Sequence, residues 1–564
     1  MALSLAGASA QTLTDRFFDE YYFPYNPTAA TSAGIHQYDD KLEDYSKKGV
    51  DKRIAILKKF EAEFAKQPIV SHIVPVIPNA WAADVDNALV LNNIRAALLD
   101  LETIRSWEKN PDLYSSGISS SAFTIMSRTF APPDVRLKSL IARERQMPQV
   151  LKDARANLKN PPKIYTEIAI EQLPGIVSFF ENDVPLAFKQ ATDAKLLTDF
   201  LETNAVVIAA LKDYEEFLRT QMLPKSNGDF RLGAANYAKK LAYEEMVDIP
   251  LDRLLKIGYD DLHANQERFR AIAAQIAAKT DPNKTPREVL TDLEKDHPAP
   301  DKLLDAFRAQ IVTLRDFIIA KKIITIPSPV LPILEETPPF ERALTTASMD
   351  TPGPYETVAK EAYFNVTLAE KDWKPERVED FMRSFNRGTI LSTATHEAYP
   401  GHYVQFLWMQ RVNSRVRKLI GANSNAEGWA HYCEQMILDE GFSTDPKMRL
   451  GQLQDALLRD ARYIVGIEMH TGKRTMEQGV EFFEKEGFQT HDLADRETKR
   501  GTSDPTYLYY TLGKLQILKL REDYRKMKGA QFSLEEFHDA FMRQGFPPIK
   551  IVRRALLAND SPTL

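Results

Sequence analysis

The segment T-H-E-A-Y-P-G-H-Y, Thr395–Tyr403, combines two histidines, a glutamate and a proline–glycine pair. His396 and His402 lie near the two ends of the segment, and Glu397 directly follows the first histidine. Two neutral imidazoles and one carboxylate form a common catalytic zinc shell, which leaves one coordination position for water. A neighbouring glutamate can then take a proton from that water. The segment therefore predicts a zinc hydrolase in which Glu397 is the general base.

The spacing of the two histidines differs from H-E-x-x-H, in which both lie on one face of a helix. On a regular helix, six residues turn through about 600°, so the rings would point about 120° apart. Pro400 cannot donate to the carbonyl of His396, and Gly401 can adopt backbone angles closed to other residues. We therefore expect a break or a two-residue bulge that returns His402 to the face of His396. The alternative is two unrelated histidines at a helix end, with Gly401 as its cap.

A second cluster, A-E-G-W-A-H-Y-C-E, follows at residues 426–434. Its polar members Glu427, His431 and Glu434 fall at i, i+4 and i+7, and therefore on one face of a helix. All three can line a metal site. A member that does not bind the metal would orient a residue that does.

Both clusters together resemble the bacterial domain-of-unknown-function family 885, whose members carry H-E-x-x-P-G-H and E-G-W-A and are regarded as zinc-peptidase-like. Four further segments resemble signatures of this family: Asn26–Ser46, Tyr363–Leu368, Arg500–Leu515 and Phe537–Pro548. The resemblance implies that His396, His402 and Glu427 bind zinc. It also implies that Glu397 is the base, and it indicates no substrate.

One segment departs from the family pattern. Many members carry R-x-V-V-D-T-G-L-H, whereas Arg462–His470 reads R-Y-I-V-G-I-E-M-H, with Gly466 in place of the aspartate. Any role of that aspartate therefore does not carry over to this chain. Arg462 and His470 match the pattern.

Several residues after the second cluster are candidates to stabilise the oxyanion that forms when water attacks a carbonyl. They are Arg500, Tyr507, Tyr510, His470 and His538. Arg500 and Tyr510 are favoured because they fall in a family signature, and His470 is retained as a third candidate. A free arginine or lysine could also bind a substrate carboxylate, as in a carboxypeptidase, and Arg462 and Lys514 are the weaker candidates for that role.

Composition excludes several classes of protein. The chain has 564 residues, with 73 basic and 79 acidic side chains, and its net charge of −6 gives no electrostatic case for nucleic acid. No apolar run approaches the roughly 18 residues of a membrane span. The single cysteine, Cys433, excludes an intramolecular disulfide, and its aromatic neighbours favour a buried structural thiol over a nucleophile or metal ligand. The sequence does not indicate an oligomeric state.

The first residues of the sequence favour an exported protein. Residues 1–10 resemble the remnant of a secretory signal peptide, a short apolar stretch that ends in the small-residue pattern Ala8-Ser9-Ala10. The basic region that usually begins such a signal is missing. We therefore favour a periplasmic or secreted protein, with a cytoplasmic one as the alternative.

Apolar residues recur at helical spacing along most of the chain. Helices are expected over residues 52–66, 84–107, 134–158, 194–222, 251–278, 301–321, 449–467, 511–527 and 533–544. The segment 322–370 is rich in proline and β-branched residues, which predicts short strands confined to sheet edges, and loops.

We therefore expect a mainly α fold, a large helical fold with a small β-sheet beside the zinc-binding helix and a deep cleft between two halves. Residues 11–321 would form an N-terminal helical half. Residues 322–564 would form the catalytic half, with the zinc site at 396–434.

These patterns predict a zinc-dependent metallopeptidase that hydrolyses short or unfolded peptides. An edge strand within 322–370 could hold an extended peptide by strand addition, although the segment could equally be a connector. One alternative is a zinc-dependent amidase or esterase acting on a non-peptide substrate. Another is a non-catalytic binding protein with a degenerate zinc site, which the presence of Glu397 argues against.

Overall fold

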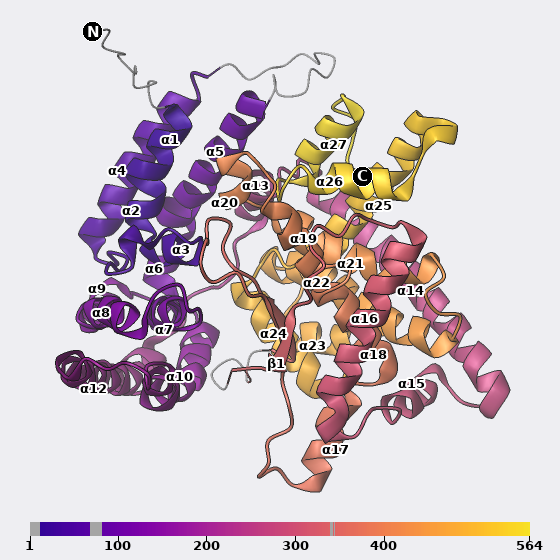
Figure 1. The fold of residues 1–564 in the computed structure, drawn as a ribbon, viewed down its shortest axis with the longest axis horizontal. Helices are drawn as coiled ribbons and strands as arrows, with labels where there is room; N and C mark the ends of the chain where they lie inside the picture. Colours follow the sequence, from indigo (N-terminus) through magenta and orange to yellow (C-terminus); the bar gives the residue numbers. More distant parts are fainter. Residues whose placement is uncertain (1–11, 68–81, 339–341, 343–344) are drawn as a thin grey trace, which may run out of the picture.

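The structure is a computed structural model that describes residues 12–67, 82–338, 342 and 345–564 (Figure 1). It confirms a mainly α fold with one small sheet. No helix in these ranges combines the length and apolarity needed to cross a membrane. The signal-peptide remnant predicted at residues 1–10 lies outside the described residues.

The first half of the chain forms two groups of helices, drawn in indigo and purple in Figure 1. The first group contains α1 (Leu13–Phe17), α2 (Phe23–Tyr25), α3 (Pro27–Ser32), α4 (Lys47–Phe64), α5 (Ala82–Leu98) and α6 (Ser106–Lys109). The second contains α7 (Asp112–Met126), α8 (Pro133–Glu144), α9 (Met147–Asn157), α10 (Lys163–Ser178), α11 (Val184–Ala187) and α12 (Ala194–Phe217). Each group surrounds its own apolar core.

The remaining helices share two further cores. One core joins α13 (Ala234–Glu244), α14 (Leu251–Thr280) and α15 (Pro286–Glu294) to α22 (Pro446–His470), α23 (Met476–Lys485) and α24 (His491–Ser503). The other joins α16 (Leu303–Lys321), α17 (Pro375–Arg383), α18 (Arg387–Glu397), α19 (His402–Met409), α21 (Asn423–Asp439), α25 (Tyr509–Lys528), α26 (Leu534–Met542) and α27 (Ile549–Leu557). The short helix α20 (Arg415–Leu419) packs instead against the first group.

This packing does not follow the boundary predicted at 321/322. Helix α14 lies along α22, and α16 lies along α18, so residues 251–321 share their cores with the predicted catalytic half. In the sequence, the boundary was placed where the composition changes at residue 322. The apolar pattern of a helix does not show which distant helix packs against it. The deep cleft between two halves stays a prediction.

The strands predicted within 322–370 are confirmed as a three-stranded sheet with the order β1-β3-β2, but β3 is central rather than at an edge, because it contains no proline and can pair on both sides. It consists of β1 (Ile333–Glu336), β2 (Ala347–Asp350) and β3 (Tyr363–Val366). β1 runs parallel to the central strand β3, and β2 runs antiparallel to it. Phe364 of β3 is buried edge-on against Phe307 of α16. β2 is an edge strand and contacts α18.

Two predicted helices are divided in the structure. The helix expected over 84–107 is interrupted at Arg105, whose backbone is left-handed, and α6 begins at Ser106. The helix expected over 134–158 is two helices, α8 and α9. Pro148 lies in the first turn of α9, where its missing N–H costs nothing, whereas inside a continuous helix it would remove a hydrogen bond. The apolar pattern continues across the break, so helical periodicity alone did not predict it.

The helices α21 and α25 cross at a contact between two glycines. A Cβ atom on Gly513 would lie 1.9 Å from the carbonyl oxygen of Ser424, and one on Gly428 would lie 2.4 Å from the Cα atom of Gly513. Only glycine therefore allows the two backbones to approach this closely. The crossing places Glu427 of α21 near Tyr510, which lies one turn before Gly513 on α25.

We expect Gly513→Ala to lower the thermal unfolding midpoint, because forcing a methyl group into packed backbone costs about 1–3 kcal/mol. Circular dichroism during heating measures the effect. Gly175→Ala in α10 is the matched control, since its methyl group would meet no other part of the chain within 4 Å and alanine is the better helix former by about 1 kcal/mol. An unchanged midpoint for Gly513→Ala would contradict the close crossing.

Candidate metal centre

The segment that carries the two histidines is divided between two helices. α18 ends at Glu397 and α19 begins at His402, and the Tyr399–Pro400 peptide bond in the connecting turn is cis. The indole N–H of Trp429 on α21 donates to the carbonyl of Pro400 at 2.8 Å. The tryptophan of the E-G-W-A motif therefore ties α21 to this turn.

Gly401 closes the turn against the end of α18. Its N–H donates to the carbonyl of Thr395 at 3.0 Å, and a Cβ atom at this position would lie 1.8 Å from the carbonyl oxygen of His396. The turn brings the rings of His396 and His402 to 4.8 Å between centroids, at 88° to each other. The predicted break is confirmed, as a complete helix end rather than a two-residue bulge.

Glu427 completes a group of three converging side chains. Its Oε2 atom lies 3.3 Å from Nε2 of His396 and 3.5 Å from Nε2 of His402. The ligand atoms of the three residues lie within 4.8 Å of one another. The predicted ligand set is therefore brought together by α18, α19 and α21.

The three side chains fit a cation. Oε2 of Glu427 is buried and has no hydrogen-bond partner among the described residues. Burial disfavours a charged imidazole, yet the neighbouring carboxylates of Glu427 and Glu434 raise the pKa of His396 to about 10. The site thus favours positive charge at this point. Two imidazole nitrogens and one carboxylate oxygen are a donor set of catalytic zinc sites, so the residues fit the predicted Zn²⁺.

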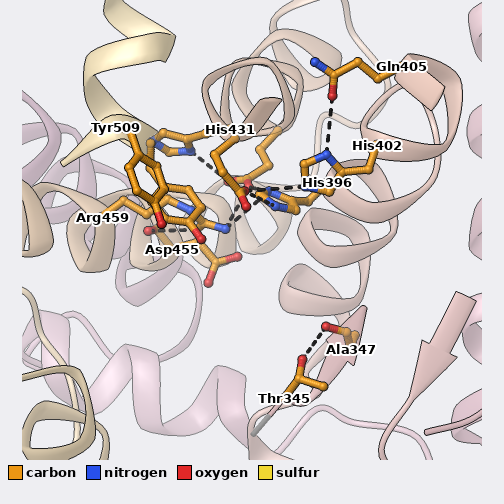
Figure 2. Close-up of polar contacts among 12 residues, drawn as sticks. Thr345, Ala347, His396, His402, Gln405, His431, Asp455, Arg459 and Tyr509 are labelled. Atoms are coloured by element: carbon orange, nitrogen blue, oxygen red, sulfur yellow. Dashed lines mark hydrogen bonds and ion pairs between the residues drawn. The ribbon is translucent and has the colours of Figure 1, made fainter. Parts of the chain in front are cut away.

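Glu434 orients His396 by contacting its Nδ1 atom. Its Oε1 atom lies 2.7 Å from Nδ1 of His396 and 2.9 Å from the guanidinium of Arg459, and its Oε2 atom lies 3.1 Å from Nδ1 of His431 (Figure 2). Although burial raises the pKa of Glu434, the charge of Arg459 holds it well below its usual range. An ionised carboxylate on Nδ1 keeps the proton there and leaves Nε2 free for a metal.

The other members of this network have clear roles. Burial lowers the pKa of His431 to about 3, so its imidazole is neutral. Nδ1 of His402 lies 3.4 Å from the side-chain oxygen of Gln405 (Figure 2). Gln405 in turn donates to the backbone and side-chain oxygens of Asn425 on α21, both at 3.3 Å. Each histidine therefore has a partner on its Nδ1 atom.

Glu397 faces the ligands and the edge strand at once. Burial raises the pKa of its carboxyl group, the nearby histidines lower it, and the Glu427 charge raises it further. The backbone N–H of Met349 on β2 also lowers this pKa slightly. The residue predicted as base thus lies between the candidate metal site and β2.

Tyr510, one of the predicted oxyanion residues, lies beside a ligand, and a second, Arg500, contacts Tyr510. The ring of Tyr510 stacks on His396 at 6.4 Å between centroids. The guanidinium of Arg500 lies 3.5 Å from the Tyr510 hydroxyl, 3.4 Å from the Tyr509 hydroxyl and 3.1 Å from Asp504. The arrangement places a phenol and a cation within one cluster next to the candidate metal site.

The third candidate, His470, lies elsewhere. Its Nε2 atom is 2.8 Å from the carbonyl of Gly501, and its ring packs near Phe230 and Tyr237. None of these contacts reaches the ligands. The family pattern gave its position in the sequence, and that position is the last residue of α22, about three turns beyond Arg459.

The cations considered for a substrate carboxylate are already paired. Arg462 donates twice to the buried carboxylate of Glu497, at 2.6 and 2.7 Å. The ammonium of Lys514 is buried and lies 2.8 Å from Asp261. Both cations are therefore already paired within the chain, and a carboxypeptidase stays a prediction.

A residue that sequence reasoning missed anchors the helix of Glu427. Glu245, directly after α13, is buried and accepts hydrogen bonds from the backbone N–H groups of Asn423 and Ser424, at 3.1 and 3.0 Å. These are the first residues of α21, whose N–H groups have no partner inside the helix. No local pattern could reveal this contact, because it joins residues that are far apart in sequence.

Comparison with known proteins identifies the family. The sequence profile of a family described as "Bacterial protein of unknown function (DUF885)" matches residues 27–556. The chain belongs to this family. The resemblance stated from the two motifs is therefore confirmed, and it extends over most of the chain. No curated protein matches the sequence.

Two solved structures share the fold. One, from Shewanella oneidensis and described as a candidate lipoprotein of unknown function, is 28% identical with a TM-score of 0.80, covering 98% of this chain and 100% of that one. The other, a candidate lipoprotein from Colwellia psychrerythraea, is 18% identical with a TM-score of 0.79, covering 98% and 99%. The second likeness shows the fold alone.

We expect Glu434→Gln to weaken zinc binding by about 10–100-fold, the usual effect of losing the carboxylate that orients a ligating histidine. Titration of zinc against a competing chelator measures the affinity. Glu202→Gln on the exposed face of α12 is the matched control. Equal affinity in both variants would show that Glu434 does not orient His396.

Proposed function

We propose that this member of the DUF885 family is a zinc-dependent metallopeptidase that hydrolyses short or unfolded peptides. The main support for the proposal is that Nε2 of His396, Nε2 of His402 and Oε2 of Glu427 converge on one point. Glu397 lies beside them. A zinc ion held there would supply Lewis acidity and would lower the pKa of water to about 7.

In this mechanism Glu397 transfers the proton. Its carboxylate takes a proton from the attacking water and passes it to the leaving amine. Glu434 takes no part in the proton transfer, because it is fully occupied by His396, His431 and Arg459.

Tyr510 and Arg500 would stabilise the negative charge that develops on the carbonyl oxygen. Both lie on the α24–α25 side of the ligands, whereas Glu397 ends α18. The phenol donates a hydrogen bond and the guanidinium contributes charge, and both act more strongly where water is excluded. Tyr510 is buried, which supports this role.

The position of β2 supports a peptide substrate. Because β2 is an edge strand, the backbone groups on its outer side are not used by the sheet. Met349 directs its N–H to Glu397, and the carbonyl of Ala347 accepts a hydrogen bond from the hydroxyl of Thr345 at 2.6 Å (Figure 2). An extended peptide added beside this strand would run past the general base.

We also propose that the protein acts outside the cytoplasm, in the periplasm or as a secreted protein. Two solved structures with the same fold are described as candidate lipoproteins. The resemblance of residues 1–10 to the end of a signal peptide supports the same location.

We expect Glu397→Gln to lower kcat by about 10²–10⁴-fold, the usual contribution of a general base, while zinc content stays unchanged. Digestion of a peptide library followed by mass spectrometry identifies a cleaved peptide, and its hydrolysis rate is then compared between variants. Glu202→Gln is again the control.

Full activity of Glu397→Gln would contradict the mechanism. Cleavage of amides or esters without cleavage of any peptide would instead indicate a zinc-dependent amidase or esterase. A zinc-loaded wild-type protein that cleaves none of these compounds would indicate a binding protein.

A further inference from the structure

The connection between β2 and β3, residues 351–362, contacts the N-terminal helices (Figure 1). The N–H of Tyr355 donates to the carbonyl of Ala33, directly after α3, at 2.9 Å. A Cβ atom on Gly353 would lie 2.1 Å from the carbonyl oxygen of Ser32, the last residue of α3. The backbone of the connection is therefore packed closely on the end of α3.

Arg128, two residues after α7, holds both ends of the same connection. Its guanidinium donates to the carboxylate of Asp350, the last residue of β2, and to the carbonyl of Glu361, two residues before β3, both at 2.6 Å. Strand β2 also contacts α18, which ends at Glu397. The N-terminal helices thus restrain the strand that lies beside the proposed general base.

His36 joins the connection to the N-terminal helices through both nitrogens of its ring. It begins a short 3-10 helix, His36–Tyr38, within the segment that resembles the first family signature. Nδ1 lies 3.0 Å from Oδ2 of Asp39, and Nε2 lies 3.0 Å from Oε2 of Glu356 in the connection. Both carboxylates are buried. The imidazole therefore lies between two acids, one from each of the two segments.

This contact requires a charged ring. A neutral imidazole has a proton on one nitrogen and a lone pair on the other, so it can donate to only one carboxylate, whereas an imidazolium donates to both. Burial disfavours the charged form, yet Asp39 and Glu356 outweigh it and raise the pKa of His36 above its usual range. The contact is therefore complete below the ordinary histidine pKa of about 6.5 and is lost as the pH rises through the raised value.

The surroundings of the ring leave these two acids in control of its proton. Among the described residues, the charged groups that contact the ring are Asp39 and Glu356. Phe130, between α7 and α8, stacks on one face of His36 with the ring centroids 3.9 Å apart. Arg143 of α8 reaches Asp39 only through a hydroxyl group: it donates to Thr31, which donates to Asp39, each at 2.7 Å.

The partner in the connection is held as an ionised carboxylate. Although burial raises the pKa of Glu356, the N–H groups of Val358 and Ala359 and the contact with His36 lower it below its usual range. Glu356 therefore keeps its charge while His36 titrates. The strength of the contact depends on the proton of His36 alone.

We propose that His36 is a positioning residue for β2: its imidazolium holds the β2–β3 connection on the N-terminal helices, and loss of its proton releases that connection. The consequence for catalysis rests on the proposed function, because it supposes that an extended peptide is held along β2. A restrained strand has less conformational freedom to lose when a peptide pairs with it. Protonation of His36 therefore strengthens peptide binding and leaves the chemical step unchanged.

Amide hydrogen exchange measures the proposed release without requiring any activity. The wild-type protein is exchanged at about pH 5.5, below the ordinary pKa of histidine, and at about pH 9, well above it, with the intrinsic pH dependence of exchange removed. We expect protection of residues 351–362 to fall about three- to tenfold from the acidic to the alkaline condition, the equivalent of one net hydrogen bond. Protection of α15, which belongs to another core, is the internal reference.

Two substitutions change this behaviour in opposite directions. His36→Gln has a single donor nitrogen and no titratable proton, so residues 351–362 should exchange rapidly in both conditions. In Glu356→Gln, the amide oxygen can still accept from the N–H groups of Val358 and Ala359. Its N–H can donate to a neutral His36 ring, whose other nitrogen donates to Asp39. Protection should therefore persist in the alkaline condition.

His491→Gln is the matched control for the loss of a histidine. The side chain of His491 on α24 is 74% exposed and contacts Glu484. This variant should show the same exchange of residues 351–362 as the wild type. Thermal unfolding of each variant checks that the fold is retained.

Peptide hydrolysis then tests the effect on substrate binding. The KM of His36→Gln divided by that of the wild type should be about three to ten in the acidic condition and should approach one in the alkaline condition. The kcat values should stay equal. Because the two proteins are compared at the same pH, titration of groups such as Glu397 affects both alike. A general loss of structure would instead lower kcat or persist in the alkaline condition.

Three results would overturn the proposal: equal protection of residues 351–362 in wild type and His36→Gln in the acidic condition, a loss of protection in Glu356→Gln that matches the wild type, or a KM ratio that is the same in both conditions. Failure of the proposed function looks different. If exchange follows the prediction but the wild-type enzyme cleaves no peptide, His36 still holds the connection and the peptidase proposal fails. If peptides are cleaved and exchange does not depend on His36, the positioning proposal fails alone.

Discussion

The buried carboxylate of Glu434 is the interaction on which the site depends. It lies at the point where α18, α21 and α22 meet, and it contacts one polar side chain from each of them: His396, His431 and Arg459. A buried carboxylate is costly unless it is paired and fully hydrogen-bonded. Both of its oxygens are occupied here, so the same contacts that make its burial tolerable also fix the direction of the first histidine. Close packing then brings His402 and Glu427 to the same point, through the turn at Gly401 and the glycine crossing of α21 with α25.

The N-terminal half takes part in the site rather than only enclosing it. Glu245 holds the first turn of α21. The helix that carries Glu427 is therefore positioned from both ends, by Glu245 at its start and by Glu434 near its end.

The sequence predicted the parts of the site that follow from local geometry. Helical spacing placed Glu427, His431 and Glu434 on one face, and Pro400 with Gly401 predicted the break that brings the histidines together. What it could not predict depends on contacts between distant segments. Arg459 lies on α22 with nothing in its surroundings to suggest a partner on α21, and Glu245 belongs to another half of the chain. The alignment of His470 with the family pattern fixed its place in the sequence but not its distance from the ligands. The same reason explains why the sequence did not show that α14 and α16 pack against helices beyond residue 322.

The account's central claim is that His396, His402 and Glu427 bind zinc. The most direct test is the amount of metal per chain, measured by plasma mass spectrometry on wild-type protein and on Glu427→Ala, both purified without chelator and then offered zinc. The account predicts about one zinc per chain in the wild type, as in a site with three protein ligands, and much less in the variant. No bound metal in the wild type, or equal zinc in both proteins, would contradict it.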